Sequence, residues 1–96
     1  MIVENQRFRL PAGLERVTAP VLAVCGHGEY AVMRGSTADV AAAIPGGKAY
    51  EVFHEGRPSL AQQHNWNMNE PVLFNEMVRA WMTGSPLPDA LHPMHA

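Results

Sequence analysis

The chain has 96 residues, with nine acidic and seven basic side chains, so its formal net charge is −2. This length limits it to one small domain that buries a modest fraction of its surface. The near-neutral charge and the scattered basic residues exclude the cationic face typical of nucleic-acid binding. The single cysteine excludes a disulfide framework and a cysteine-based zinc site.

The apolar segments are too short to cross a membrane. The longest, residues 19–25, falls far below the roughly 20 residues needed to span a bilayer. The first residues also lack the charged-then-apolar order of a signal peptide. We therefore expect no membrane association and a cytoplasmic location.

Three segments are expected along the chain. Residues 1–18 form a lead-in with a short helical turn near Leu14, and residues 19–84 form an α/β unit. Residues 85–96 contain three prolines, the first of which is Pro86, and this composition predicts a flexible tail.

The α/β unit begins with a continuous apolar run at residues 21–25, bounded by Pro20 and Gly26. Such a run is typical of a strand in a parallel sheet covered on both faces. Within it, Cys25 is interpreted as a small buried residue rather than a catalytic thiol. Ser36, with Asp39 three residues later, resembles a capping box and predicts a helix that ends at Pro45.

A second strand is predicted over residues 49–53, then a loop over 54–63 and a helix that starts near Pro71. That helix carries two apolar i, i+4 rows, made by Leu73, Met77 and Trp81 and by Phe74, Val78 and Met82. The expected fold is thus α/β, with the order β-α-β-α and parallel strands. Because two parallel strands do not make a self-sufficient sheet, this order favours an incomplete domain.

Three motifs in this order resemble the C-terminal third of α/β-hydrolase-fold proteins. Residues 19–29 match the family's strand pattern Pro-Val-Leu-x-Val-x-Gly followed by an acid, and residues 41–46 match its helix ending Ala-x-x-Ile-Pro-Gly. Residues 64–71, followed by Phe74 and Asn75, are similar to its catalytic-histidine segment.

The resemblance implies a serine-type hydrolase acting on a small-molecule ester or related acyl bond, without cofactor or metal. By position, Glu29 would be the acid that orients the histidine, and His64 would be the general base. The family order is serine, then acid, then histidine, and this chain contains no Gly-x-Ser-x-Gly. The nucleophile is therefore expected upstream of Met1, and the chain alone is expected to be inactive.

The segment departs from the family pattern in three ways: the acid is glutamate rather than aspartate, Gln63 replaces the usual glycine before the histidine, and the preceding loop is longer. Other interpretations stay open at this point. Glu29 is alternatively an ordinary loop acid, or part of a metal site with His27 and His64. A fragment of a non-hydrolytic member of the same fold is a further alternative.

A different class of function is a non-enzymatic interaction module. An open sheet edge and the broad apolar face of residues 72–83 would drive homodimerisation or docking on a partner chain.

Overall fold

The computed structural model describes residues 10–56 and 58–94. Its strands are β1 (Leu22–Gly26), β2 (Lys48–Val52) and β3 (Leu91–Pro93). Its helices, in chain order, are the 3₁₀ turn η1 (Leu14–Arg16), α2 (Ala31–Ala43), α3 (Leu60–His64), α4 (Trp66–Asn69) and α5 (Pro71–Thr83). Within these residues, no helix has the length and apolar character needed to cross a membrane.

The three strands form one mixed sheet in the order β1-β2-β3. β1 and β2 are parallel, with Leu22 opposite Lys48 and Gly26 opposite Val52, whereas β3 runs antiparallel to β2. The α/β class and the parallel pair are therefore confirmed. The third strand was not predicted: it comes from the segment 85–96 that the sequence assigned to a flexible tail.

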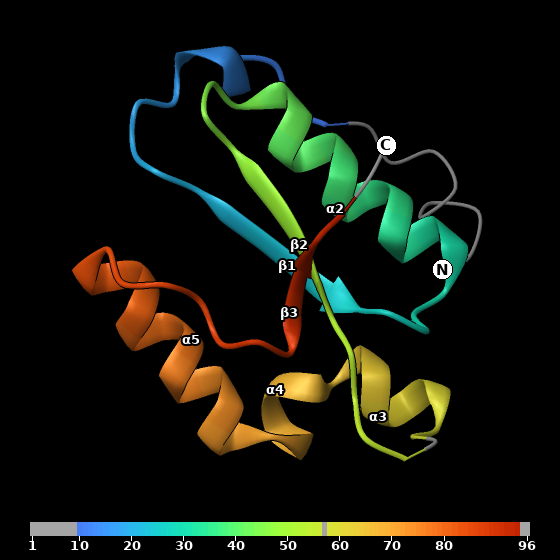
Figure 1. Cartoon of the computed structure of the whole chain (residues 1–96). Coiled ribbons are helices and arrows are strands. Elements are labelled where there is room, and N and C mark those ends of the chain that lie inside the picture. Colours follow the sequence, from blue (N-terminus) through green and yellow to red (C-terminus); the bar gives the residue numbers. More distant parts are fainter. Residues whose placement is uncertain (1–9, 57, 95–96) are drawn as a thin grey trace.

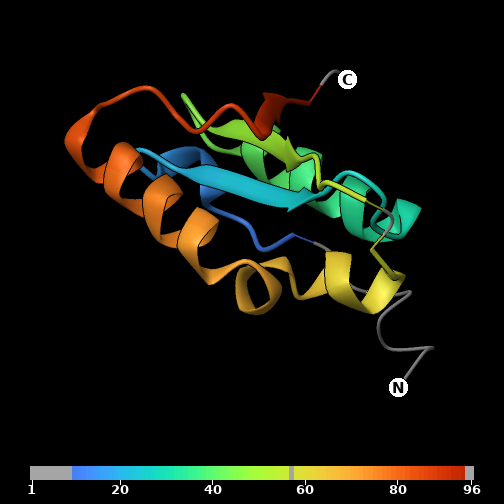
Figure 2. The same cartoon turned by 60° about the horizontal axis from the view of Figure 1, so that its bottom comes forward.

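The sheet lies between two helical layers, with α2 on one face and α4 and α5 on the other (Figures 1 and 2). The period-two alternation of the strands explains this arrangement. The side chains that join the core with α4 and α5 come from alternate strand positions, namely Leu22, Val24, Tyr50 and Val52. The intervening residue Glu51 instead contacts Arg34 of α2.

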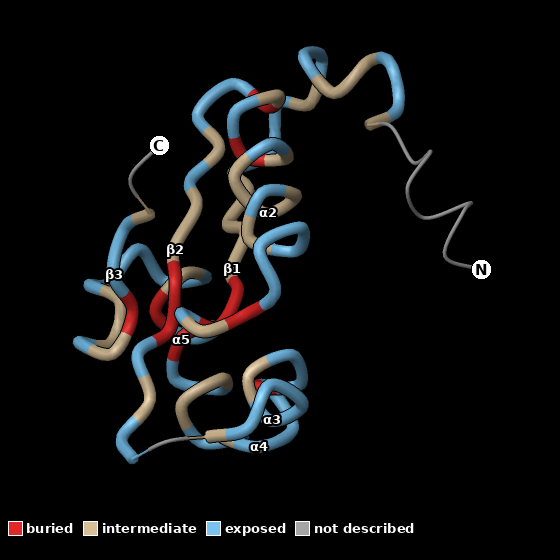
Figure 3. The backbone as a smooth tube through the Cα atoms, turned by 90° about the vertical axis from the view of Figure 1, so that its right-hand side faces the viewer, coloured by how far each residue is buried: buried red, intermediate tan, exposed pale blue. Residues whose placement is uncertain are grey.

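The core is small and lies mainly between β2 and the α4–α5 layer. It consists of Val52, Trp66, Met77 and Leu91, and Val52 is completely buried. Burial increases toward the carboxyl ends of β1 and β2 (Figure 3). These strand ends are therefore the best-packed part of the sheet.

The predicted start of α2 was wrong. The helix begins at Ala31, so Ser36 is an interior residue, and its hydroxyl donates to the carbonyl of Val32 at 3.0 Å. A serine inside a helix can satisfy its hydroxyl on the carbonyl four residues earlier, which makes the Ser-x-x-Asp pattern ambiguous.

The segment 54–63, predicted as a loop, contains most of the short helix α3. Ser59 caps this helix: its hydroxyl accepts from the Gln62 N–H at 3.2 Å, and the Gln62 side chain accepts from the Ser59 N–H at 2.9 Å. This reciprocal pair is a capping box, and Ser-x-x-Gln was visible in the sequence. α3 starts at this cap and ends at His64.

Candidate active site

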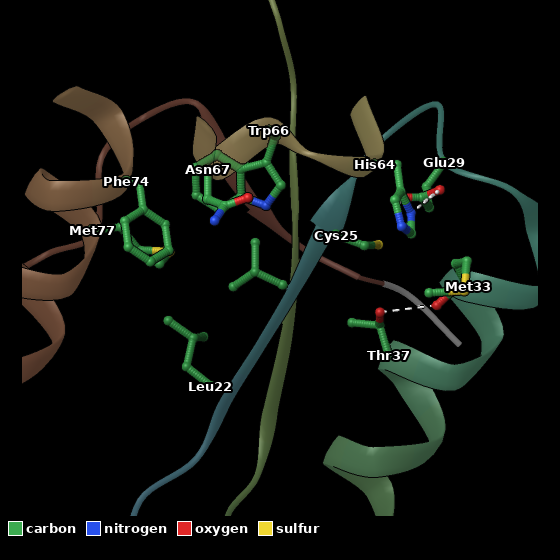
Figure 4. A pocket seen from close by; sticks show the side chains of 11 residues that line it. Leu22, Cys25, Glu29, Met33, Thr37, His64, Trp66, Asn67, Phe74 and Met77 are labelled. Atoms are coloured by element: carbon green, nitrogen blue, oxygen red, sulfur yellow. Dashed lines mark hydrogen bonds and ion pairs between the residues drawn. The ribbon is translucent and has the colours of Figure 1, made fainter. Parts of the chain in front are cut away.

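Glu29 and His64 meet beyond the carboxyl end of β1. Glu29 lies three residues after that strand, and His64 is the last residue of α3. His64 Nδ1 lies 3.2 Å from Glu29 Oε2 and 3.3 Å from Oε1, so the imidazole faces both carboxylate oxygens (Figure 4). The Glu29 side chain is 4% exposed, whereas that of His64 is 48% exposed. A buried acid thus supports a solvent-accessible imidazole.

This contact defines the chemistry available to the imidazole. An ionised carboxylate only accepts hydrogen bonds, so the proton of the neutral ring lies on Nδ1 and the lone pair lies on Nε2. Glu29 Oε1 also accepts from the Tyr30 N–H at 3.1 Å, which holds the carboxylate in place. The arrangement is that of a general base oriented by an acid.

A cavity of about 360 Å³ adjoins the pair. Its wall runs along β1 from Leu22 and Val24 to Cys25, with helix residues on both sides of the strand (Figure 4). The remaining lining residues are Glu29, Met33, Thr37, His64, Trp66, Asn67, Phe74 and Met77. Among residues 10–56 and 58–94, β1 has a strand neighbour only on its β2 side, so the cavity lies beside the edge of β1 where a further strand could pair.

Two lining residues could in principle serve as nucleophiles, and neither is activated. The Thr37 hydroxyl donates to the carbonyl of Met33 at 3.0 Å. Cys25 is buried, as predicted, and burial raises the pKa of its thiol. A thiol with a raised pKa is mostly protonated at neutral pH and is a weak nucleophile. The lining therefore supplies an acid and a base without a partner to attack a substrate.

His27 does not join Glu29 and His64. Its Nδ1 pairs with Glu51, whose other carboxylate oxygen lies 3.1 Å from Arg34 Nη2. Arg34 also donates to the His27 carbonyl at 2.7 Å. The described residues contain no group of three or more histidine, cysteine or acidic side chains placed to hold a metal ion.

Glu51 of β2 forms a charged cluster with His27 and Arg34. Burial alone would raise the pKa of Glu51, but hydrogen bonds from His27 and Arg34 outweigh it and hold that pKa below its usual range. No motif in the sequence pointed to this cluster. The signal was one acidic residue inside the otherwise apolar segment 49–53, since a buried charge needs a partner.

Glu51→Gln is expected to destabilise the fold by about 1–2 kcal/mol at pH 7, because a charged hydrogen-bonded pair is lost. A carboxyl whose pKa is lowered by folding adds stability above its unfolded pKa, about 4.3 for glutamate, and loses it as the pH falls through the folded value. The difference between the two proteins should therefore begin to shrink as the pH falls below the unfolded pKa of about 4.3, and it should disappear only once the pH lies below the lower, folded pKa. Urea unfolding at several pH values measures it.

The exposed Glu76 of α5 offers the matched control for this pH series, since Glu76→Gln makes the same change in charge. A Glu51→Gln effect that stays constant from neutral to acidic pH would contradict the electrostatic explanation.

A second His–Glu pair was also missed. His54, which follows β2, pairs through Nδ1 with Glu70, the residue that precedes α5. The His54 side chain is only 4% exposed, and its Nε2 has no hydrogen-bond partner among residues 10–56 and 58–94. The pair joins the end of β2 to the start of α5 and lies away from the cavity beside β1.

No protein-family model, curated protein or solved structure matches this chain. The functional assignment therefore depends on the geometry of Glu29 and His64.

Proposed function

We propose that this chain carries the acid and the base of a serine-type hydrolytic site in an α/β-hydrolase-like fold. Glu29 is the acid and His64 is the general base. The nucleophile and the donors that stabilise the oxyanion come from polypeptide that completes the sheet beside β1. The substrate class is a small-molecule ester or related acyl compound.

The main support for this proposal is the contact between His64 Nδ1 and the buried Glu29 carboxylate, which lies at a cavity beside β1. The two residues are 35 positions apart in sequence. Their meeting beyond the end of a parallel strand agrees with the rule that ligands of open α/β sheets bind outside the carboxyl ends of the strands.

In this mechanism His64 Nε2 removes the proton from a serine hydroxyl as its oxygen attacks the acyl carbon. The imidazolium that forms is stabilised by Glu29, which stays ionised. His64 then returns the proton to the leaving alcohol, and a water molecule repeats the cycle to release the acid. Each step uses the same Nδ1–Glu29 hydrogen bond.

The test is to express the chain with the polypeptide encoded immediately upstream in the same reading frame. We expect a Gly-x-Ser-x-Gly segment there, and turnover of a p-nitrophenyl ester by the joined protein. The 96-residue chain alone is expected to show none. Turnover by the purified chain that is abolished in His64→Ala, or an upstream frame without a nucleophile, would overturn the proposal.

A second candidate is a homodimeric interaction module, and the character of β1 favours it. An exposed edge strand usually carries charge or proline along its length, because unpaired N–H and C=O groups invite pairing with another chain. β1 reads Leu-Ala-Val-Cys-Gly and has no such residue. Two copies related by a two-fold axis would pair their β1 edges antiparallel and bury this apolar strand.

Met33→Lys is expected to convert such a dimer to monomer, because Met33 lines the cavity beside β1 and a lysine there would place like charges across the two-fold axis. Sedimentation equilibrium of the purified protein measures the change. Val32→Lys on the same helix is the matched control, since Val32 is 73% exposed and is not part of the cavity wall. A monomeric wild-type protein, or a dimer that Met33→Lys leaves intact, rules out this interface.

A further inference from the structure

Gln63 links the segment that carries the acid to the helix that carries the base. It immediately precedes His64 in α3, and its Oε1 accepts a hydrogen bond from the N–H of Gly28, the residue before Glu29. Its Nε2 donates to the carbonyl of Pro58 at 3.4 Å. One amide group therefore contacts both backbone segments next to the proposed catalytic pair.

Gly26, the last residue of β1, and Gly28, two residues later, both lie close to Gln63. A Cβ added to Gly28 would clash with the amide group of the Gln63 side chain. A Cβ added to Gly26 would lie 2.9 Å from the Gln63 carbonyl oxygen, a backbone atom. Glycine at both positions thus lets α3 contact the end of β1.

Helix α3 has few other anchors. It spans five residues, and none of them is buried. The first buried residue that follows it is Trp66 of α4. The orientation of His64 toward Glu29 therefore depends on polar contacts rather than on packing within α3.

We propose that Gln63 is a positioning residue that sets the hydrogen bond between Glu29 and His64 Nδ1. The inference deepens the proposed function, in that it assigns a role relative to the same acid and base. Through Gly28, the Gln63 amide fixes the carboxylate and imidazole relative to each other. Without it, α3 can shift away from the 27–29 segment and the imidazole loses its defined tautomer.

The first test measures the tautomer of His64 from its ¹⁵N imidazole shifts under mildly alkaline conditions. The tautomer reports which nitrogen carries the proton, and this is set by hydrogen bonding. We expect the Nδ1–H form to dominate in the wild type and to fall in Gln63→Met, which keeps the side-chain length and removes both hydrogen bonds. Glu29→Ala gives the Nδ1–H fraction of His64 without the carboxylate. The fraction in Gln63→Met should approach that reference value.

Gln62→Ala is the matched control for this measurement. It removes one of the two capping-box hydrogen bonds of α3, the one from the Ser59 N–H to the Gln62 side chain, without touching Gly28, so it reports loss of helix stability alone. We expect it to keep more of the Nδ1–H form than Gln63→Met does. Equal loss in both variants, or a wild-type tautomer in Gln63→Met, would overturn the inference.

A second test stays informative even if Gln63→Met fails to fold. Gly28→Ala should displace the Gln63 amide and lower the Nδ1–H fraction, and its effect on the urea midpoint should shrink in a Gln63→Ala background, where the side chain is gone. Gly26→Ala should not be relieved in that background, because its clash is with the Gln63 backbone. Additive midpoint changes for Gly28→Ala and Gln63→Ala would overturn the inference.

These measurements do not depend on hydrolysis. If the joined protein shows no esterase activity while Gln63→Met shifts the tautomer, the proposed function fails and the positioning role stands. If activity depends on His64 and the tautomer does not respond to Gln63, the reverse holds.

Discussion

His64→Ala should lower ester hydrolysis by the joined protein by about 10⁴–10⁶-fold, the range seen when the base of a serine-type triad is removed. The reason is that His64 Nε2 is the proposed proton acceptor, and its lone pair is held available by the Nδ1 contact with Glu29. Steady-state kcat/KM with an activated ester measures the loss. Binding of a product analogue should change little, because the imidazole acts mainly in the transition state.

Glu29→Gln should have a smaller effect, about 10²–10⁴-fold, since the base stays present while its tautomer and its imidazolium are less well supported. His27→Ala serves as the control, because His27 lies two residues before Glu29 in the sequence but pairs with Glu51 and not with Glu29. A loss in His27→Ala as large as that in His64→Ala would show that the assignment of the base is incorrect.

Trp66→Ala should cost about 3–5 kcal/mol of folding free energy, the usual cost of removing a buried aromatic side chain. Trp66 is 6% exposed, belongs to the cluster with Val52, Met77 and Leu91, and contacts the Phe74 ring edge-on with centroids 5.5 Å apart. A domain of this size has little stability in reserve. We therefore expect a largely unfolded protein, seen as lost urea cooperativity and a collapsed near-ultraviolet circular dichroism signal.

Trp81→Ala is the matched control, because Trp81 lies on the same helical layer and is only half-buried. Its cost should be clearly smaller. Since Trp66 begins α4 two residues after His64, a milder variant such as Trp66→Phe should preserve the fold and show whether packing at this position also supports the site.

Local patterns in the sequence were enough for the elements with strong apolar periodicity. The strand at residues 21–25 and the helix from Pro71 were predictable, because continuous apolar runs and i, i+4 rows reflect burial directly. The start of α2 was not, because Ser36 has two ways to satisfy its hydroxyl. β3 was missed because three residues with a proline carry little strand signal, and the antiparallel pairing with β2 supplies what propensity does not.

For the candidate site, too, the sequence predicted one part and the tertiary structure decided the rest. From the sequence, Glu29 and His64 were predicted as an acid and a base by their positions in motifs that resemble those of α/β-hydrolase-fold proteins. Only the tertiary structure decided that they touch, because 35 residues separate them and their distance depends on how α3 packs against the end of β1. It also decided the partners of His27 and His54 and revealed the Gln63 contact. Those are long-range polar pairings, and nothing in local periodicity or spacing encodes which donor a buried carboxylate will meet.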